Sequence, residues 1–295
     1  DLLTDMVGEF PELQGIMGRY YALHDGLAPE IADALEDHYK PRFAGDSLPR
    51  GMVGTVVALA DKLETLTGMF GIGQIPTGDR DPFALRRHAL GVIRMLAEGD
   101  LDLPLNSLLT VAGQAFGGSE GFKSAESALA DFIYDRLAGS LREQGYTAQE
   151  VDAVVAQRPQ RLGDIPKRLA AVRAFSALPE AAALAAANKR VGTILKKVED
   201  SVEAWVDAAL LREPAEVALH AALVDVVPEA DAAFVTGDYT GSLLALAALR
   251  APVDNFFDDV MVNAEDPALR ANRLGLLAKL HAAMNQVADL SKLST

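Results

Sequence analysis

Apolar residues recur along most of the chain at the three- and four-residue intervals of amphipathic helices. In the stretch 81–100, Leu85, Ala89, Val92 and Leu96 share this spacing, and Gly99 follows as a stop signal. Alternating runs of β-branched residues, which would indicate strands, are hard to find, and aromatic residues make up only 6% of the chain. The pattern therefore predicts an all-α protein of about a dozen helices without a β-sheet.

Helix start signals support this fold class. Asp81-Pro82 and Asp266-Pro267 each place a capping carboxylate before a proline, which suits the first position of a helix. Thr147 and Glu150 have the spacing of a capping box, in which side chains and backbone amides bond reciprocally. We expect helices to begin at these three places.

Two glycine-rich stretches interrupt the helical pattern. Residues 68–80 hold four glycines and one proline, which predicts a loop between two helices. Residues 113–121 hold four more glycines. We place the domain boundary there, at about residue 115, with one helical domain over residues 1–115 and a second over residues 116–295.

Composition narrows the class of protein. Half of the 295 residues are hydrophobic, which allows a large core and excludes bulk disorder. Cysteine is absent, so disulfides, thiolate nucleophiles and cysteine-bound zinc are excluded. No apolar run approaches the ~18–20 residues of a membrane span, and the first residues lack the features of a signal peptide. The chain does not begin with Met, so we expect it to be part of a longer protein.

Charge is distributed unevenly. The net charge of −15 argues against a surface that binds nucleic acid over its whole extent. Residues 158–197, however, hold nine lysines and arginines against two acids, a local charge of +7, so the rest of the chain carries −22. A basic face on an acidic body suggests one oriented contact with a polyanion. The candidate nucleic-acid contacts are Arg161, Lys167, Arg168, Lys189, Arg190, Lys196 and Lys197, with Arg270 and Arg273 on a later helix.

Four of these cations have a helical spacing. If residues 189–204 form one helix, Lys189 lies above Lys196 and Arg190 above Lys197, because positions seven apart differ by only ~20°. The stripe would span about two turns, enough to meet two or three phosphates. A competing interpretation is an exposed pair of Lys196 with Asp200, which would contribute only ~0.3–0.5 kcal/mol.

The sequence offers no autonomous active site. Gly73 and Gly78 have part of the spacing of a phosphate-binding loop, but Asp79-Arg80 follows where such a loop has Lys-Ser/Thr. His24-Asp25 resembles the centre of an HD metal site, with Asp61 as a candidate for its distant carboxylate, but no upstream histidine is present. No activated serine stands out. We predict no catalytic residue, no metal site and no cofactor in this chain.

Several long segments resemble the β subunit of the bacterial two-subunit glycyl-tRNA synthetase. These are EFPELQGIMGRYYALHDG, the run from LPRGMVGTVVALADKLETLTGMFGIGQIPTGDR to DPFALRRHALGVIRML, NKRVGTILKK, and the ending FFDDVMVNAEDPALRANRLGLLAKL. The resemblance covers almost the whole chain and matches the C-terminal half of that subunit. It implies an HD-like helical domain followed by a helical-bundle anticodon-binding domain of the DALR type, with Pro267 in place of the leading Asp.

The resemblance also implies partners. In that family the α subunit carries the active site for glycine and ATP, with Mg, and pairs with β in a cytoplasmic α2β2 tetramer. This chain would then bind tRNA-Gly without catalysing the reaction alone, and would contact neither membrane nor DNA. Two alternatives stay open: a metal-dependent HD phosphohydrolase, which needs a bound metal, and a helical adaptor that binds another protein.

Overall fold

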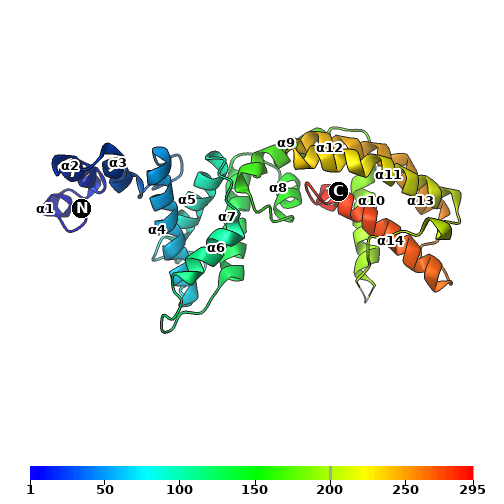
Figure 1. Ribbon diagram of the computed structural model, residues 1–295, viewed down its shortest axis with the longest axis horizontal. Coiled ribbons are helices and arrows are strands. Elements are labelled where there is room, and N and C mark those ends of the chain that lie inside the picture. The colour runs from blue at the N-terminus through cyan, green and yellow to red at the C-terminus, as the bar shows by residue number, and fades with distance from the viewer. Residues whose placement is uncertain (199–200, 295) are drawn as a thin grey trace. The chain divides into compact units, whose positions relative to one another are not determined.

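The computed structural model describes residues 1–198 and 201–294, and every regular element in that part is a helix, which confirms the all-α prediction (Figure 1). A single isolated bridge between Thr77 and Arg80 is the one β-type contact in the described residues. By its internal contacts the chain forms two compact units. Unit 1 comprises Asp1–Ser140 and Gln160–Gly163, and unit 2 comprises Leu141–Pro159 and Asp164–Thr295. The family-domain boundary expected at residue 115 stays a prediction.

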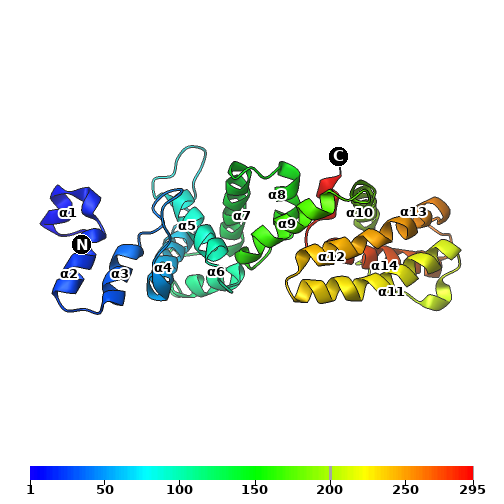
Figure 2. The same cartoon turned by 90° about the horizontal axis from the view of Figure 1, so that it is seen from above.

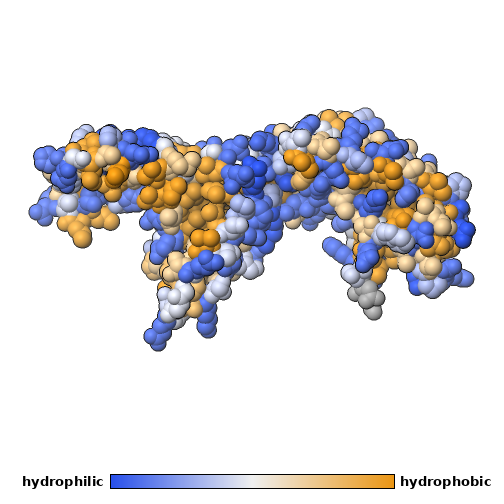
Figure 3. All heavy atoms as spheres, in the orientation of Figure 1, coloured by the Kyte–Doolittle hydropathy of each residue, from blue (hydrophilic) through white to orange (hydrophobic). Residues whose placement is uncertain are grey.

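Unit 1 is built from short helices followed by longer ones. Its helices are α1 (Asp5–Glu9), α2 (Ile16–His24), α3 (Pro29–Asp37), α4 (Gly51–Gly71), α5 (Leu85–Glu98), α6 (Leu105–Gln114) and most of α7 (Glu126–Glu143), with the 3-10 turn η1 (Pro11–Leu13). The residues predicted for the buried face of α5 are at most 1% exposed, so that prediction is confirmed. The first half of α4 instead leaves Met52 and Val56 65% and 56% exposed, in a region where Figure 3 shows apolar atoms at the surface.

The glycine-rich loop lies four residues later in the chain than predicted. Residues 68–71 continue α4, and the loop runs from residue 72 to residue 84. The helix expected at Asp81-Pro82 starts at Leu85, because the Asp81 carboxylate accepts hydrogen bonds from the backbone N–H groups of Leu85 (2.7 Å) and Arg86 (2.9 Å). Asp81 therefore caps α5 from four residues away, and the prediction of Pro82 as the first helical residue is wrong.

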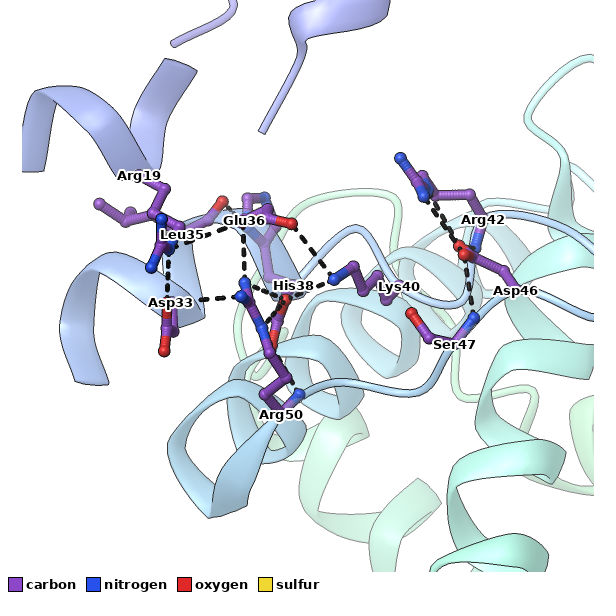
Figure 4. A network of polar contacts seen from close by, with 11 residues as sticks. Arg19, Asp33, Leu35, Glu36, His38, Lys40, Arg42, Asp46, Ser47 and Arg50 are labelled. Atoms are coloured by element: carbon purple, nitrogen blue, oxygen red, sulfur yellow. Dashed lines mark hydrogen bonds and ion pairs between the residues drawn. The ribbon is translucent and has the colours of Figure 1, made fainter. Parts of the chain in front are cut away.

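A network of ion pairs joins α2, α3 and α4 (Figure 4). The fully buried Asp37 accepts hydrogen bonds from the Arg50 guanidinium, with Nε to Oδ2 at 2.9 Å, and pairs with the Lys40 ammonium at 2.9 Å. Burial alone would raise the pKa of Asp37, but hydrogen bonds from both cations hold it below its ordinary value. The network therefore holds the turn between α3 and α4 in place and gives the buried Asp37 carboxylate cationic partners.

Unit 2 is a bundle of helices of 7 to 22 residues. It holds α8 (Ala148–Val155), α9 (Ile165–Ser176), α10 (Ala181–Lys196), α11 (Pro214–Val235), α12 (Tyr239–Ala245), α13 (Arg250–Asp259) and α14 (Pro267–Met284), and it ends in the 3-10 turn η5 (Leu290–Leu293) (Figure 2). The capping box of Thr147 and Glu150 is confirmed at the start of α8. Asp266 caps α14 by accepting from the Ala268 N–H at 2.8 Å, as predicted.

None of the described helices is long and apolar enough by itself to cross a membrane. The segments Leu162–Ser176 and Ala181–Lys196 reach the required length and composition only when they are taken together, and the chain bends by 111° between them.

Candidate nucleic-acid interface

The cationic residues predicted on one long helix lie on α10 and at its end. α10 stops at Lys196, with Lys197 as its C-cap, so the expected helix over residues 189–204 is wrong. Alanines supply most of its first two turns and favour helix, whereas the chain beyond residue 200 is not helical up to Asp207. The competing partner Asp200 lies outside the described residues.

Lys189 and Lys196 share one site. Both side chains are exposed, and both line a pocket of about 620 Å³ in unit 2. The other two cations are placed differently: the Arg190 guanidinium stacks over the Phe257 ring of α13, 4.1 Å from its centroid, and Lys197 is exposed at the helix end. Of the four cations in the predicted stripe, the structure thus brings two, Lys189 and Lys196, to one pocket. Arg190 and Lys197 do not line that pocket.

The pocket gains residues from the C-terminal end of the chain that the sequence reasoning missed. His281 and Asn285 come from the end of α14, and Asp289, Ser291, Lys292 and Ser294 come from the segment around η5. Three lysines therefore face one carboxylate, and that carboxylate already accepts from the Ser291 N–H (3.0 Å) and hydroxyl (2.6 Å). Lys292 carried no signal in the sequence, because it is a single cation about a hundred residues from the basic window.

Two close contacts hold the walls of the pocket together. The side-chain amides of Asn188 and Asn285 donate to each other reciprocally, both at 3.0 Å, and Asn188 is fully buried. Opposite them, Gly192 lets α14 approach: a Cβ at this position would lie 3.3 Å from Nε2 of His281. Burial and, to a smaller degree, the charge of Lys196 lower the pKa of His281, so its imidazole is neutral at pH 7.

Two predicted contacts are buried inside unit 2. Arg168 is 8% exposed, and its guanidinium donates to the carbonyls of Gln286 (3.1 Å) and Val287 (2.6 Å) and packs over Tyr239. Arg273 is 7% exposed and forms an ion pair with Glu216, which is 1% exposed. Both guanidinium groups therefore bind partners inside the protein, and we remove both residues from the predicted interface.

The remaining predicted cations are exposed or partly exposed but are not gathered at the pocket. Lys167 lies on α9 and Arg270 on α14, both at the surface. Arg161 belongs to unit 1, where its Nε lies 3.0 Å from the Asp102 carboxylate. These three residues stay predictions.

The residues proposed for an HD metal site do not come together. His24 is the last residue of α2 and is exposed, as its position before Gly26 predicted. Asp61 lies on α4 and lines a cavity of unit 1 to which His24 does not contribute. Within residues 1–198 and 201–294, no three histidine, aspartate or glutamate side chains are placed to hold a metal ion.

Comparison with known proteins identifies the family. A family model described as "Glycyl-tRNA synthetase beta subunit" matches residues 1–156, more than half of the chain. The chain belongs to this β-subunit family. A second model, the "DALR anticodon binding domain", matches residues 184–295. The DALR region therefore contains most of α10, all of α14 and nearly the whole lysine-lined pocket.

Curated relatives agree with this family. The "Glycine--tRNA ligase beta subunit" of Dechloromonas aromatica (strain RCB) is 86% identical over 294 residues, which covers 100% of this chain and 41% of that relative. The proteins of the same name from Janthinobacterium sp. (strain Marseille) and Polaromonas naphthalenivorans (strain CJ2) are each 73% identical, over 100% and 99% of this chain. The chain thus spans about two-fifths of the length of these β subunits.

Proposed function

We propose that this chain is the tRNA-binding part of a glycine–tRNA ligase, and that unit 2 binds the anticodon region of tRNA-Gly through the pocket of α10 and η5. The observation that supports this most directly is the convergence of Lys189, Lys196 and Lys292 on one pocket within the region that matches a DALR anticodon-binding domain. The whole enzyme would then attach glycine in an ATP- and Mg-dependent reaction on its α subunit, in a cytoplasmic α2β2 assembly.

The geometry suits an RNA loop. Lys189 and Lys196 are seven residues apart on one helix, so their Cα atoms are separated by about 10 Å along the axis and their ammonium groups can reach separate phosphates. Between them the pocket offers hydrogen-bonding groups such as those of Thr193, Ser294 and Gln157. Single-stranded loops expose unstacked bases, whose edges are read by such polar groups. Lysines would thus hold the backbone while the pocket receives a base.

Unit 1 is proposed to be an HD-like scaffold rather than a phosphohydrolase. The placement of His24 and Asp61 on separate surfaces supports a scaffold, since metal-dependent hydrolysis needs both side chains on one ion. Elemental analysis of the purified chain tests this point. Stoichiometric metal that is lost on Asp61→Ala would contradict it.

The tRNA proposal is tested by a salt-dependent binding titration of the 295-residue chain against tRNA-Gly and an unrelated tRNA. The variant Lys189→Glu/Lys196→Glu should bind tRNA-Gly more weakly with little loss of thermal stability. If two phosphate contacts are lost, the slope of log K against log salt should fall by about 1.4–1.8.

A matched control separates local contact from overall charge. Arg80→Glu/Lys123→Glu changes the net charge by the same amount at two exposed sites in unit 1. This control should leave the slope nearly unchanged. Equal affinities and slopes for the wild type and the Lys189/Lys196 variant would show that tRNA does not bind at this pocket.

A further inference from the structure

Unit 1 contains a cavity of about 530 Å³ that the tRNA proposal does not use. Its walls come from the segment after α1, the chain between α3 and α4, the middle of α4 and the start of α5. The charged residues that line it are Glu12, Arg42, Asp61, Lys62 and Arg87, together with the imidazole of His88. The volume is that of a pocket for a small organic ligand.

Lys62 is a buried cation without a carboxylate partner. It is 4% exposed, and no acidic side chain of the described residues lies within 4.0 Å of its ammonium group. The ammonium donates one hydrogen bond, to the His38 carbonyl at 3.0 Å, and so keeps two N–H groups in reserve. Burial lowers the pKa of Lys62, so an anion bound at the wall of the cavity would stabilise the charged form of this lysine.

The fold makes room for this lysine. The side chain of Lys62 crosses Gly91 of α5, where a Cβ would lie 2.8 Å from its Cε atom. Gly91 lies in the middle of a regular helix, where glycine is unfavourable by about 1 kcal/mol relative to alanine. The Lys62 side chain thus passes directly over the backbone of α5 at Gly91 on its way to the cavity.

Two further donors lie next to Lys62. The Nδ1 atom of His88 is buried and has no hydrogen-bond partner among the described residues. Burial, followed by the charge of Lys62, lowers the pKa of His88, so the ring is neutral at pH 7 and has one N–H to donate. The exposed Arg87 also lines the cavity, and its charge acts on His88. Arg42 is different: its guanidinium is held by Asp46 at 2.9 and 3.2 Å (Figure 4).

We propose that this cavity binds a phosphate group, either of a free nucleotide or of RNA, with Lys62, His88 and Arg87 as its donors. Three separate donor groups match an oxyanion with at least three acceptor oxygens, and the remaining volume accommodates a nucleoside. The acids Asp61 and Glu12 oppose the phosphate charge. Asp61 lies near enough to Lys62 and His88 to influence the pKa of both. The site is therefore expected to be weak, and it does not depend on the tRNA pocket, which lies in unit 2.

The electrostatic origin of the site makes opposite predictions for two neighbouring residues. Lys62→Met should weaken binding at least tenfold, because it removes the buried cation. Asp61→Asn should strengthen binding severalfold, because it removes a repelling charge and keeps the shape. If Lys62 had only a structural role, Asp61→Asn would not strengthen the binding of phosphate. Arg80→Gln, which removes an exposed cation outside the cavity, serves as the control and should change nothing.

The experiment is a calorimetric or ³¹P NMR titration of the 295-residue chain with inorganic phosphate and with AMP, at ionic strength held constant with chloride. Saturable binding that follows the order Asp61→Asn, wild type, Lys62→Met supports the proposal. Absence of saturable binding to the wild type, or equal affinity in a folded Lys62→Met variant, overturns it. If Lys62→Met does not fold, the exposed Arg87→Gln replaces it, and unchanged affinity in both Arg87→Gln and Asp61→Asn overturns the proposal.

Competition identifies the source of the phosphate. Tighter binding of AMP than of inorganic phosphate, unaffected by tRNA, indicates a free nucleotide as the ligand. Displacement of AMP by tRNA indicates an RNA phosphate. The variant Lys189→Glu/Lys196→Glu should leave the AMP titration unchanged, so failure of the tRNA proposal and failure of this one are separate outcomes.

Discussion

Replacing Arg273 by methionine separates a structural arginine from an RNA-binding one on the same helix. The side chain is 7% exposed, and its Nε pairs with the Glu216 carboxylate while its terminal N–H donates to the Met261 carbonyl at 2.7 Å. Methionine fills a similar volume but removes the charge. The variant therefore leaves Glu216, which is 1% exposed, without its cation.

The loss of unfolding free energy in Arg273→Met depends on the hydrogen bonds that Glu216 retains. Breaking one side of a buried ion pair typically costs 3–5 kcal/mol. Glu216 retains hydrogen bonds from the backbone N–H groups of Arg212 (2.6 Å) and Glu213 (2.9 Å), so we expect a loss near the lower end, about 3 kcal/mol. For a cooperative unit of about 150 residues, this corresponds to a fall in Tm of about 6–12 °C.

Thermal and urea unfolding followed by circular dichroism measure the effect, with Arg270→Met as the matched control. Arg270 lies one turn earlier on α14 but is exposed, so its replacement should change stability by no more than about 0.5 kcal/mol. Glu216→Gln in the Arg273→Met background should recover part of the loss, since the buried charge is then absent.

Below its Tm, Arg273→Met should bind tRNA like the wild type. Equal stability of the two single variants, or a folded Arg273→Met protein with weakened tRNA binding, would refute this reasoning.

Three further predictions concern local structure. Asp266→Ala removes the N-cap of α14 and should lower the free energy of unfolding by about 1 kcal/mol in urea titrations. Gly275→Ala should destabilise unit 2 by more than about 2 kcal/mol, because the new Cβ would clash with the backbone carbonyl oxygen of Trp205. The hydrogen bond from Arg42 lowers the pKa of Asp46 from 3.8 to about 2. The stabilisation from ionised Asp46 should therefore be complete above about pH 4 and lost as the pH falls toward 2, whereas Asp46→Asn should flatten the stability profile over this range.

Features that depend on nearby residues could be predicted from the sequence. The capping box at Thr147 and the cap at Asp266 were found because each involves atoms within three residues. The buried face of α5 followed from its periodicity. The start of α5 was placed three residues too early, because sequence alone does not show that Asp81 caps amides four and five residues away.

Features that depend on distant partners could not be predicted. Whether an arginine is a surface cation or a core residue depends on what faces it. Arg168 donates hydrogen bonds to carbonyls more than a hundred residues away, and Arg273 pairs with a glutamate 57 positions away. The pocket itself joins α10 to a segment near residue 292, so Lys292 and His281 could not be added to Lys189 and Lys196 by spacing.

The reciprocal amide pair of Asn188 and Asn285 has a consequence for the entropy of RNA binding. The two side-chain amides hydrogen-bond to each other and so fix two positions, 97 residues apart in the chain, next to the lysines of the pocket. A backbone that is already ordered loses little conformational freedom when RNA binds, so more of the electrostatic attraction appears as affinity. Asn188→Ala would accordingly weaken RNA binding without removing any charge, through added motion of α10 relative to the end of the chain. In this view the two asparagines determine how rigidly the positive charge is presented.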